Sequence, residues 1–302
     1  MRHRRYRPLF LILARTSRDQ DPTRSITLRN QFAADARRRF RKIWKLVAES
    51  VGANDCFGLA EESRQPFTLQ AIPPKQFQFR RDADKVIAFM AWLQEMIDKE
   101  ILDVYYVFTE GRSGLWSDTY VMSAYQKGLI QARADLIATG VPLMPYVPFT
   151  LAASLNSPFN ADRLELMYTR VFTDLKGVTE SMSTQMSRVL SQALAEGIGP
   201  FETARRLVDK VENIGMARAK LIARTETIYA LNSAALSEYA AAEQVIGKPI
   251  LAQWWTAMDE RVCSICGPRH GKIYTQAAVQ AIMVPHPLCR CSILPYIEGS
   301  SV

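Results

Sequence analysis

Apolar residues recur every three or four positions along most of the chain, which is the pattern of amphipathic α-helices. The clearest stripe follows Asp21-Pro22, where Asp is suited to cap a helix and Pro to open it, and this stripe ends at Gly52. Its apolar members are Leu28, Phe32, Ala36, Phe40, Ile43, Val47 and Val51. Comparable patterns predict further helices over residues 83–102, 117–139, 161–196, 201–211 and 216–242.

The pattern is interrupted in two places and changes character near the C-terminus. Residues 53–82, with Pro66, Pro73 and Pro74, predict a linker-like excursion, and the three prolines of residues 141–148 predict an extended connector. From Gly247 onward, β-formers and aromatic residues alternate with turn residues. The predicted fold is therefore mainly α, with a small C-terminal β-rich α+β module. The expected divisions are an N-terminal arm (1–20), a helical body (21–246) that carries the excursion at 53–82, and the module (247–302).

The positive charge is concentrated at the N-terminus. The chain of 302 residues has a net charge of +8, and its first fifty residues contain fourteen Lys and Arg against four acids. Such an asymmetric basic segment favours a polyanionic partner, either the phosphates of double-stranded DNA or an acidic protein surface, although a solvated basic helix face explains it as well. The candidate contact residues on the first helix are Arg37, Arg38, Arg41, Lys42 and Lys45.

No stretch predicts a membrane span, which requires about 20 consecutive apolar residues. The apolar run at residues 8–14 follows several arginines and faintly resembles a signal peptide. It is too short, and Arg15 and Arg18 follow it without a small-residue cleavage site.

Residues 255–291 hold four of the five cysteines and two of the three histidines. Cys263 and Cys266 form a C-x2-C pair, and His286 and Cys289 repeat the spacing as H-x2-C after nineteen intervening residues. Each pair can direct two ligands at one ion from a tight turn, so the spacing predicts a tetrahedral metal site, and the thiolates favour Zn²⁺.

The fourth ligand is open between His286 and Cys291. Side chains at positions i and i+2 of an extended segment point to the same side, so Cys291 can take the place of His286 beside Cys289. His270 is a weaker candidate because it belongs to neither pair.

Three other interpretations of the cysteines fit the sequence less well. Disulfides are less expected without a secretory signal, a thioredoxin-like centre lacks a surrounding βαβ pattern, and unligated thiols leave the paired spacing unexplained. A closed site with four protein ligands is structural, because catalysis needs an open position for water. The glutamate of zinc deaminases is also missing, because no histidine is followed two residues later by Glu. We therefore expect a structural Zn²⁺ and no enzymatic activity.

The C-terminal third resembles the phage Mu F-like minor head proteins, also called the phage head morphogenesis family, over about residues 220–292. The resemblance is carried by Ile222-Ala-Arg-Thr-Glu226, Asn232, Tyr239, Trp255-Thr-Ala-x-Asp259-x-Arg261-Val-Cys263-x-x-Cys266, Gly271 and His286-Pro-x-Cys289-Arg-Cys291. It implies a minor structural protein inside the head of a tailed phage, present in the host cytoplasm during assembly. The implied partners are the portal protein, the major capsid or scaffold protein and packaged DNA.

Within this resemblance, Asp259 and Arg261 flank the first metal turn and are expected to brace it. Two other functions compete with a head protein. One is a zinc-containing nucleic-acid-binding or processing protein that uses the basic N-terminal segment, and the other is an enzyme such as a nuclease or toxin. The chain lacks a Gly-rich phosphate loop and a nucleophile elbow, which disfavours the enzyme.

Overall fold

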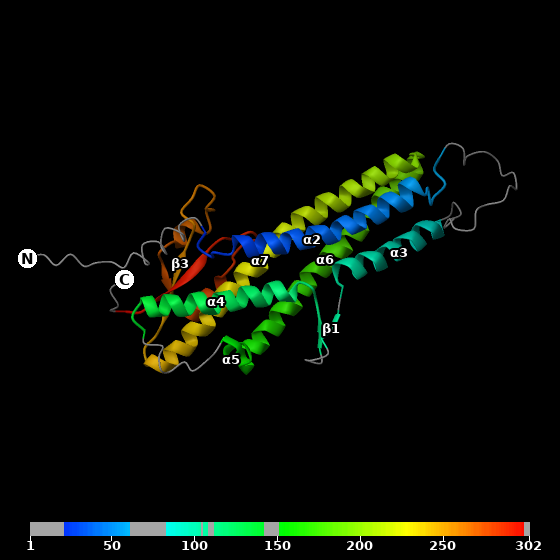
Figure 1. The fold of residues 1–302 in the computed structure, drawn as a ribbon. Helices are drawn as coiled ribbons and strands as arrows, with labels where there is room; N and C mark the ends of the chain where they lie inside the picture. The colour runs from blue at the N-terminus through cyan, green and yellow to red at the C-terminus, as the bar shows by residue number, and fades with distance from the viewer. Residues whose placement is uncertain (1–20, 61–82, 104, 108–111, 142–150, 299–302) are drawn as a thin grey trace, which may run out of the picture. The chain divides into compact units, whose positions relative to one another are not determined.

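The computed structural model describes residues 21–60, 83–103, 105–107, 112–141 and 151–298. Helices dominate, as the sequence predicts, and a three-stranded antiparallel sheet lies near the C-terminus (Figure 1). The predicted arm at 1–20, the connector at 141–148 apart from Val141, and most of the excursion at 53–82 lie outside the described residues.

The chain divides into two compact units. Unit 1 comprises Met1–Phe32, Ser117–Arg170 and Ala223–Val302, and unit 2 comprises Ala33–Trp116 and Val171–Ile222. Helices α2 (Ile26–Val47), α6 (Pro158–Glu196) and α7 (Pro200–Ile246) each contribute residues to both units.

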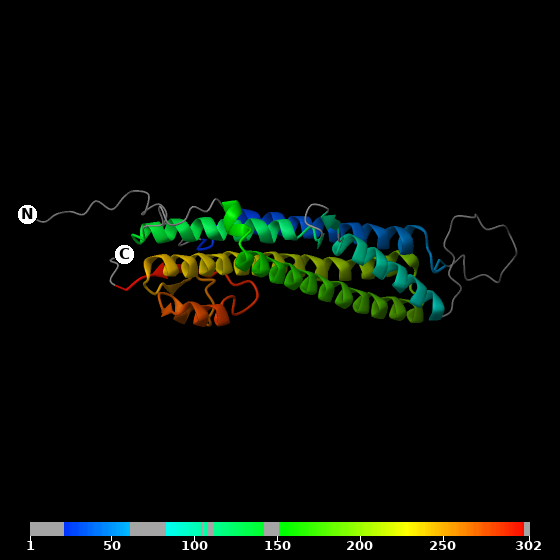
Figure 2. The same cartoon turned by 90° about the horizontal axis from the view of Figure 1, so that it is seen from below.

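Unit 2 is helical and contains most of α2, with a π-helical extension at Ala48–Ala53, together with α3 (Ala83–Ile101) and parts of α6 and α7. These segments run alongside one another in Figures 1 and 2. The apolar stripe of α2 is buried, as predicted, from Phe40 through Ile43 and Val47 to Val51. A hairpin of β1 (Tyr105–Val107) and β2 (Arg112–Gly114) follows α3.

Helix α7 is one continuous helix where the sequence analysis expected two, at 201–211 and 216–242. The buried stripe passes through Leu207, Val211, Gly215 and Ala219 in steps of four, so the helical period is never broken. Gly215 is required by packing: a Cβ there would lie 2.6 Å from Cγ of Phe40 on α2.

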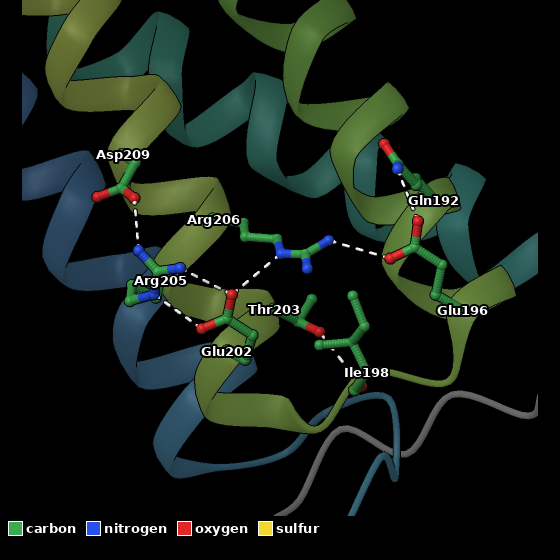
Figure 3. Close-up of polar contacts among 8 residues, drawn as sticks. All are labelled: Gln192, Glu196, Ile198, Glu202, Thr203, Arg205, Arg206 and Asp209. Atoms are coloured by element: carbon green, nitrogen blue, oxygen red, sulfur yellow. Dashed lines mark hydrogen bonds and ion pairs between the residues drawn. The ribbon is translucent and has the colours of Figure 1, made fainter.

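An exposed ionic network joins the end of α6 to the start of α7 (Figure 3). Glu202, in the first turn of α7, accepts hydrogen bonds from Arg205 and Arg206, and Arg206 also donates to Glu196 of α6. Hydrogen bonds from Arg205 and Arg206 lower the pKa of Glu202 to about 2. Because these groups are solvent-exposed, the network contributes weakly and is screened by salt.

We expect Glu202→Gln to lower the melting temperature slightly and in a pH-dependent way. A carboxylate whose pKa falls on folding stabilises the folded state above its ordinary pKa of 4.5, and this contribution is lost as the pH falls towards about 2. Thermal melts of both proteins from neutral pH to about pH 2 measure the effect. The difference between them should shrink below pH 4.5 and fade at high salt, and a difference independent of pH would contradict the assignment.

Unit 1 contains α4 (Asp118–Ala138), the short α5 (Leu151–Leu155), the C-terminal half of α7, the sheet and α8 (Gln276–Ile282). The strands are β3 (Leu251–Trp255), β4 (Ile273–Tyr274) and β5 (Ser292–Tyr296), in the order β4-β3-β5. Register pairs Trp254 with Ile293 and Ala252 with Tyr274. Figure 2 shows the sheet and α8 along the C-terminal half of α7.

The core of unit 1 joins the helices to the β-rich residues. Leu136 of α4, Tyr239 of α7, Ala252 of β3, Val279 of α8 and Ile293 of β5 belong to one buried cluster. Two ion pairs with largely buried glutamates also connect helices of unit 1. Arg133 of α4 pairs with Glu238 of α7, and Arg170 of α6 pairs with Glu226 of α7. Buried residues between Ile250 and Ile293 therefore pack on the helices, and the folding of residues 247–302 as a separate module stays a prediction.

Candidate metal centre

The first pair of cysteines lies in a tight turn that follows β3. The N–H groups of Cys266 and Gly267 donate to the carbonyl oxygen of Cys263, and the Cys266 N–H also lies 3.3 Å from the Cys263 sulfur. Burial by itself raises the pKa of Cys263, but hydrogen bonds from the backbone N–H and the side chain of Cys266 and from the Ile265 N–H help to lower it overall. The turn therefore prepares Cys263 to act as a thiolate ligand.

The second pair lies between α8 and β5, in a turn closed by a hydrogen bond from the Cys289 N–H to the His286 carbonyl. Nδ1 of His286 lies 2.8 Å from the carbonyl oxygen of Pro287. When Nδ1 carries the proton and donates to this oxygen, Nε2 keeps a free lone pair, which is the form that binds a metal. Nε2 points to the cysteines of the first turn.

Three of the four donors predicted from the spacing, Cys263, Cys266 and His286, lie together, and the fourth, Cys289, lies next to Cys266. Nε2 of His286 is 3.1 Å from Sγ of Cys263 and 3.2 Å from Sγ of Cys266, and the sulfurs of Cys266 and Cys289 are 3.9 Å apart. Around a tetrahedral Zn²⁺, sulfur and nitrogen donors would be about 3.5 Å apart and two sulfurs about 3.8 Å apart. These three separations differ from the tetrahedral values by only a few tenths of an ångström, whereas Cys289 does not lie within 4.8 Å of both Cys263 and His286 and would have to move closer to bind the same ion.

Cys291 lies beside the same group. The ligand atoms of Cys266, Cys289 and Cys291 are all within 4.8 Å of one another, as are those of Cys263, Cys266 and His286. Cys266 belongs to both groups, whereas His286 and Cys291 each belong to one. The structure therefore keeps both candidates for the fourth position close to the shared thiol.

Burial, hydrogen bonds and repulsion between thiolates shift the pKa values of the thiols in this cluster. Burial and the negative charge of Cys289 raise the pKa of Cys266 to about 12, whereas a hydrogen bond from Cys291 lowers the pKa of Cys289 to about 6. The pKa of Cys291 is raised, mainly by that same bond. A divalent cation among these sulfurs would stabilise several thiolates at once.

His270 does not join the donors. Its Nδ1 accepts a hydrogen bond from the Thr256 backbone N–H at 3.1 Å, and its ring packs against Trp255 with centroids 4.6 Å apart. This histidine holds the end of β3 against the loop that follows the first turn.

Asp259 and Arg261 form the expected pair, and Arg290 joins them. Oδ2 of Asp259 accepts hydrogen bonds from Arg261 at 2.8 Å and from Nη1 of Arg290 at 2.6 Å, and Oδ1 accepts a further one from Arg290. Hydrogen bonds from Arg290, above all, hold the pKa of Asp259 well below its usual range. Since Arg290 lies between Cys289 and Cys291, this bidentate pair ties the two turns together. The only sequence signal for Arg290 was its place in the Cys-Arg-Cys motif.

Helix α7 anchors the second turn and β5 through three polar residues spaced seven apart. The hydroxyl of Thr225 accepts from the Leu288 N–H, Asn232 donates to the Cys291 carbonyl at 3.2 Å, and Tyr239 donates to the Ile293 carbonyl. A spacing of seven places all three on one face of the helix. The resemblance contained Asn232 and Tyr239 without assigning them a role.

The candidate contact residues of α2 lie in unit 2. On α2 they lie either on the face opposite the buried apolar stripe or at the edge of that stripe. Arg38 pairs with Asp35 and Lys42 pairs with Glu100, both at 2.8 Å. Arg41 and Lys45 are exposed and form no ion pair with any described residue. Arg37 and Arg41 line a groove of about 170 Å³ with Trp44, Phe40, Val211, Glu212 and Met216.

Comparison with known protein families finds a similarity in the C-terminal part of the chain. Residues 184–294 match the family described as Phage Mu protein F like protein. This Mu F-like segment begins before the residues that carried the resemblance and includes the end of α6, all of α7 and both cysteine turns. No curated protein and no solved structure matches the chain.

The Mu F-like segment therefore contains every donor of the cluster together with Thr225, Asn232, Tyr239, Asp259 and Arg290. Its helix and its turns are joined by hydrogen bonds within unit 1. Among the described residues, none of the helices is long and apolar enough to cross a membrane.

Proposed function

We propose that this protein is a minor structural protein of a tailed-phage head that acts in head morphogenesis. The observation that carries the proposal is the Mu F-like match over residues 184–294, which contains the Cys/His cluster. The family suggests a role in phage head assembly, and hence a location in the virion. The finer parts of the proposal are association with the portal protein and the capsid interior, and presence in the host cytoplasm during assembly.

The role proposed for the cluster is to bind one structural Zn²⁺ that holds the two turns together. Three thiols and an imidazole form the donor set that zinc prefers, and Cys266 and Cys289 are nearly inaccessible to solvent. With four protein donors the ion would be closed to substrate, so we propose a structural and not an enzymatic role.

Co-purification tests the portal association. We expect a tagged chain, expressed with the portal protein and the major capsid or scaffold protein of the same phage, to retain the portal protein through size-exclusion chromatography. We also expect mass spectrometry of purified heads to detect the chain in few copies. Its absence from heads whose portal and capsid proteins are detected would overturn the proposal.

A second candidate role, contact with double-stranded DNA, is favoured by the basic face of α2. Arg41 and Lys45 are exposed cations without an ion pair among the described residues, so binding phosphates would not require them to leave a protein partner. Such contacts would be largely independent of sequence.

We expect the substitution of Arg37, Arg38, Arg41 and Lys42 by Ala to abolish a salt-dependent shift of duplex DNA. Each phosphate contact that is lost should reduce the slope of log K against log salt by about 0.9. Electrophoretic mobility shifts and fluorescence anisotropy at several salt concentrations measure both quantities.

The matched control removes the same charge from exposed positions of α6 and α7 in unit 2: Lys176, Arg188, Arg218 and Lys220. If both quadruple variants weaken DNA binding equally, the effect reflects net charge and the α2 face has no specific role. If neither changes a measurable shift, DNA contact through α2 is wrong, and the α2 face is left to a protein partner.

A further inference from the structure

Arg29 is an unusually buried arginine in unit 1. It lies in the first turns of α2, and only 6% of its surface is exposed. Its Nη2 lies 3.2 Å from Oδ1 of Asp21, whereas Nε and Nη1 are buried and have no hydrogen-bond partner among the residues that the structure describes. Leaving guanidinium donors buried and unpaired is costly, so such a group calls for a missing partner.

Three further arginines of unit 1 come from other segments: Arg224 on α7, and Arg261 and Arg290 at the two cysteine turns. Burial, first of all, lowers the pKa of Arg29, and the positive charges of Arg224 and Arg290 lower it further. The pKa of Arg224 is likewise lowered by burial and then by Arg290 and Arg261. Arg29 is therefore repelled by Arg224 and Arg290, and Arg224 is repelled by Arg290 and Arg261.

The carboxylates nearby do not neutralise the group. Asp259 is already bonded to both Arg261 and Arg290, and Asp21 makes one hydrogen bond to Arg29 while it also accepts from the Ile26 N–H at the start of α2. Arg224 forms no ion pair with any residue that the structure describes. Four guanidinium groups thus face two carboxylates, and most of the free donors belong to Arg29 and Arg224.

We propose that Arg29 and Arg224, supported by Arg290, form a binding site for a single phosphate group. A tetrahedral oxyanion offers several acceptors to converging guanidinium groups, and arginine forks are suited to bidentate phosphate recognition. Because Arg29 is almost completely buried, the ligand must be small or must present a terminal phosphate. A phosphodiester within a DNA duplex is too encumbered to reach Arg29.

A metal–thiolate cluster is negatively charged, and this charge is a second explanation for the presence of the arginines. Zn²⁺ with three thiolates and a neutral imidazole carries a net charge of −1. Two positive charges remain after the two aspartates are counted, so such a cluster neutralises only part of the excess. It also supplies no hydrogen-bond acceptor to Nε and Nη1 of Arg29, since these have no partner among the described residues, the cysteines included.

Calorimetric titration of the full, metal-loaded chain with inorganic phosphate tests the site, with sodium chloride at the same ionic strength as the blank. We expect saturable binding of one phosphate per chain and an increase in melting temperature that chloride does not reproduce. Arg224→Gln should weaken phosphate binding by about tenfold or more, because a charge-assisted hydrogen bond is lost. Arg218→Gln is the matched control, since Arg218 is an exposed arginine two turns earlier on the same helix.

Several outcomes would overturn the proposal. One is that phosphate has no effect beyond that of chloride, and another is that Arg224→Gln and Arg218→Gln bind phosphate equally well. A duplex oligonucleotide that binds through Arg224 while inorganic phosphate does not would assign the arginines to DNA. If Arg224→Gln lowers the zinc content of the protein and phosphate has no effect on wild type, the arginines belong to the metal cluster. Arg29→Lys, which keeps the charge but loses the fork, should also weaken phosphate binding if the site exists.

Discussion

Cys266→Ser is expected to remove the bound metal from the protein and to disorder the residues around the two turns. Cys266 is the one thiol that lies within reach of both alternative donor sets, so its loss breaks the site whichever side chain is the fourth ligand. The apolar packing beneath the turns is modest, since it consists mainly of Trp254 against Cys266, Cys289 and Cys291. For structural zinc sites the binding free energy is on the order of 10 kcal/mol, and much of it is folding free energy.

Elemental analysis and limited proteolysis measure this effect. We expect about one Zn²⁺ per chain in freshly purified wild type and none in Cys266→Ser, with protease cleavage appearing between residues 256 and 291. Removal of the metal by a chelator should produce the same cleavage in wild type. Trp254 is buried against the sulfurs, so its fluorescence should change with the metal.

Cys56→Ser is the matched control, because Cys56 is a buried thiol in unit 2. It should retain the metal. His286→Ala and Cys291→Ser then identify the fourth ligand, since only one of them should lose zinc. Reduced wild type that contains no metal would refute the site, and the cluster would then be a group of thiols with unequal pKa values.

The donors of the cluster were predictable from sequence because their chemistry is local. A C-x2-C turn and an H-x2-C turn each fix two ligands within four residues. The spacing alone directs the two ligand side chains of a turn to the same side of the backbone. The contacts of Thr225, Asn232 and Arg290 depend on tertiary structure instead. Nothing in the spacing of Thr225 and Leu288 along the chain indicates that the helix hydroxyl meets that backbone N–H.

The same distinction applies to the fold. Long stripes such as that of α2 predicted helices well, because burial on one face imposes the helical period. Helix α8 was missed, since seven residues are too few to establish a period and its cap, Thr275, is a single residue. The break expected near residue 215 was wrong because glycine there serves helix packing and not chain reversal.

Gly128→Ala is expected to be the most destabilising small substitution in the helices of unit 1. A Cβ at this position of α4 would lie 2.5 Å from the carbonyl oxygen of Leu231 and 2.7 Å from Cβ of Ala234, both on α7. The first of these atoms is backbone and the second is a methyl group without rotamers, so neither can move aside. The two helices must therefore separate, and tightly packed cores resist such a shift.

We expect Gly128→Ala to cost about 3 kcal/mol or more, which for a domain of this size corresponds to a fall in melting temperature of roughly 10 °C. Helix propensity works in the opposite direction, because alanine favours a helix over glycine by about 1 kcal/mol. Thermal and denaturant unfolding of the metal-loaded protein measure the net effect.

Gly177→Ala provides the matched comparison. Gly177 lies within α6, and an added Cβ would meet no heavy atom within 4 Å, so only the gain in helix propensity applies and stability should stay the same or rise by up to about 1 kcal/mol. The contrast between the two glycines isolates the contact of α4 with α7 from propensity. Equal effects of the two substitutions would mean that α4 and α7 do not approach as closely as the structure places them, and the position of Asn232 and Tyr239 beneath the metal turns would then need revision.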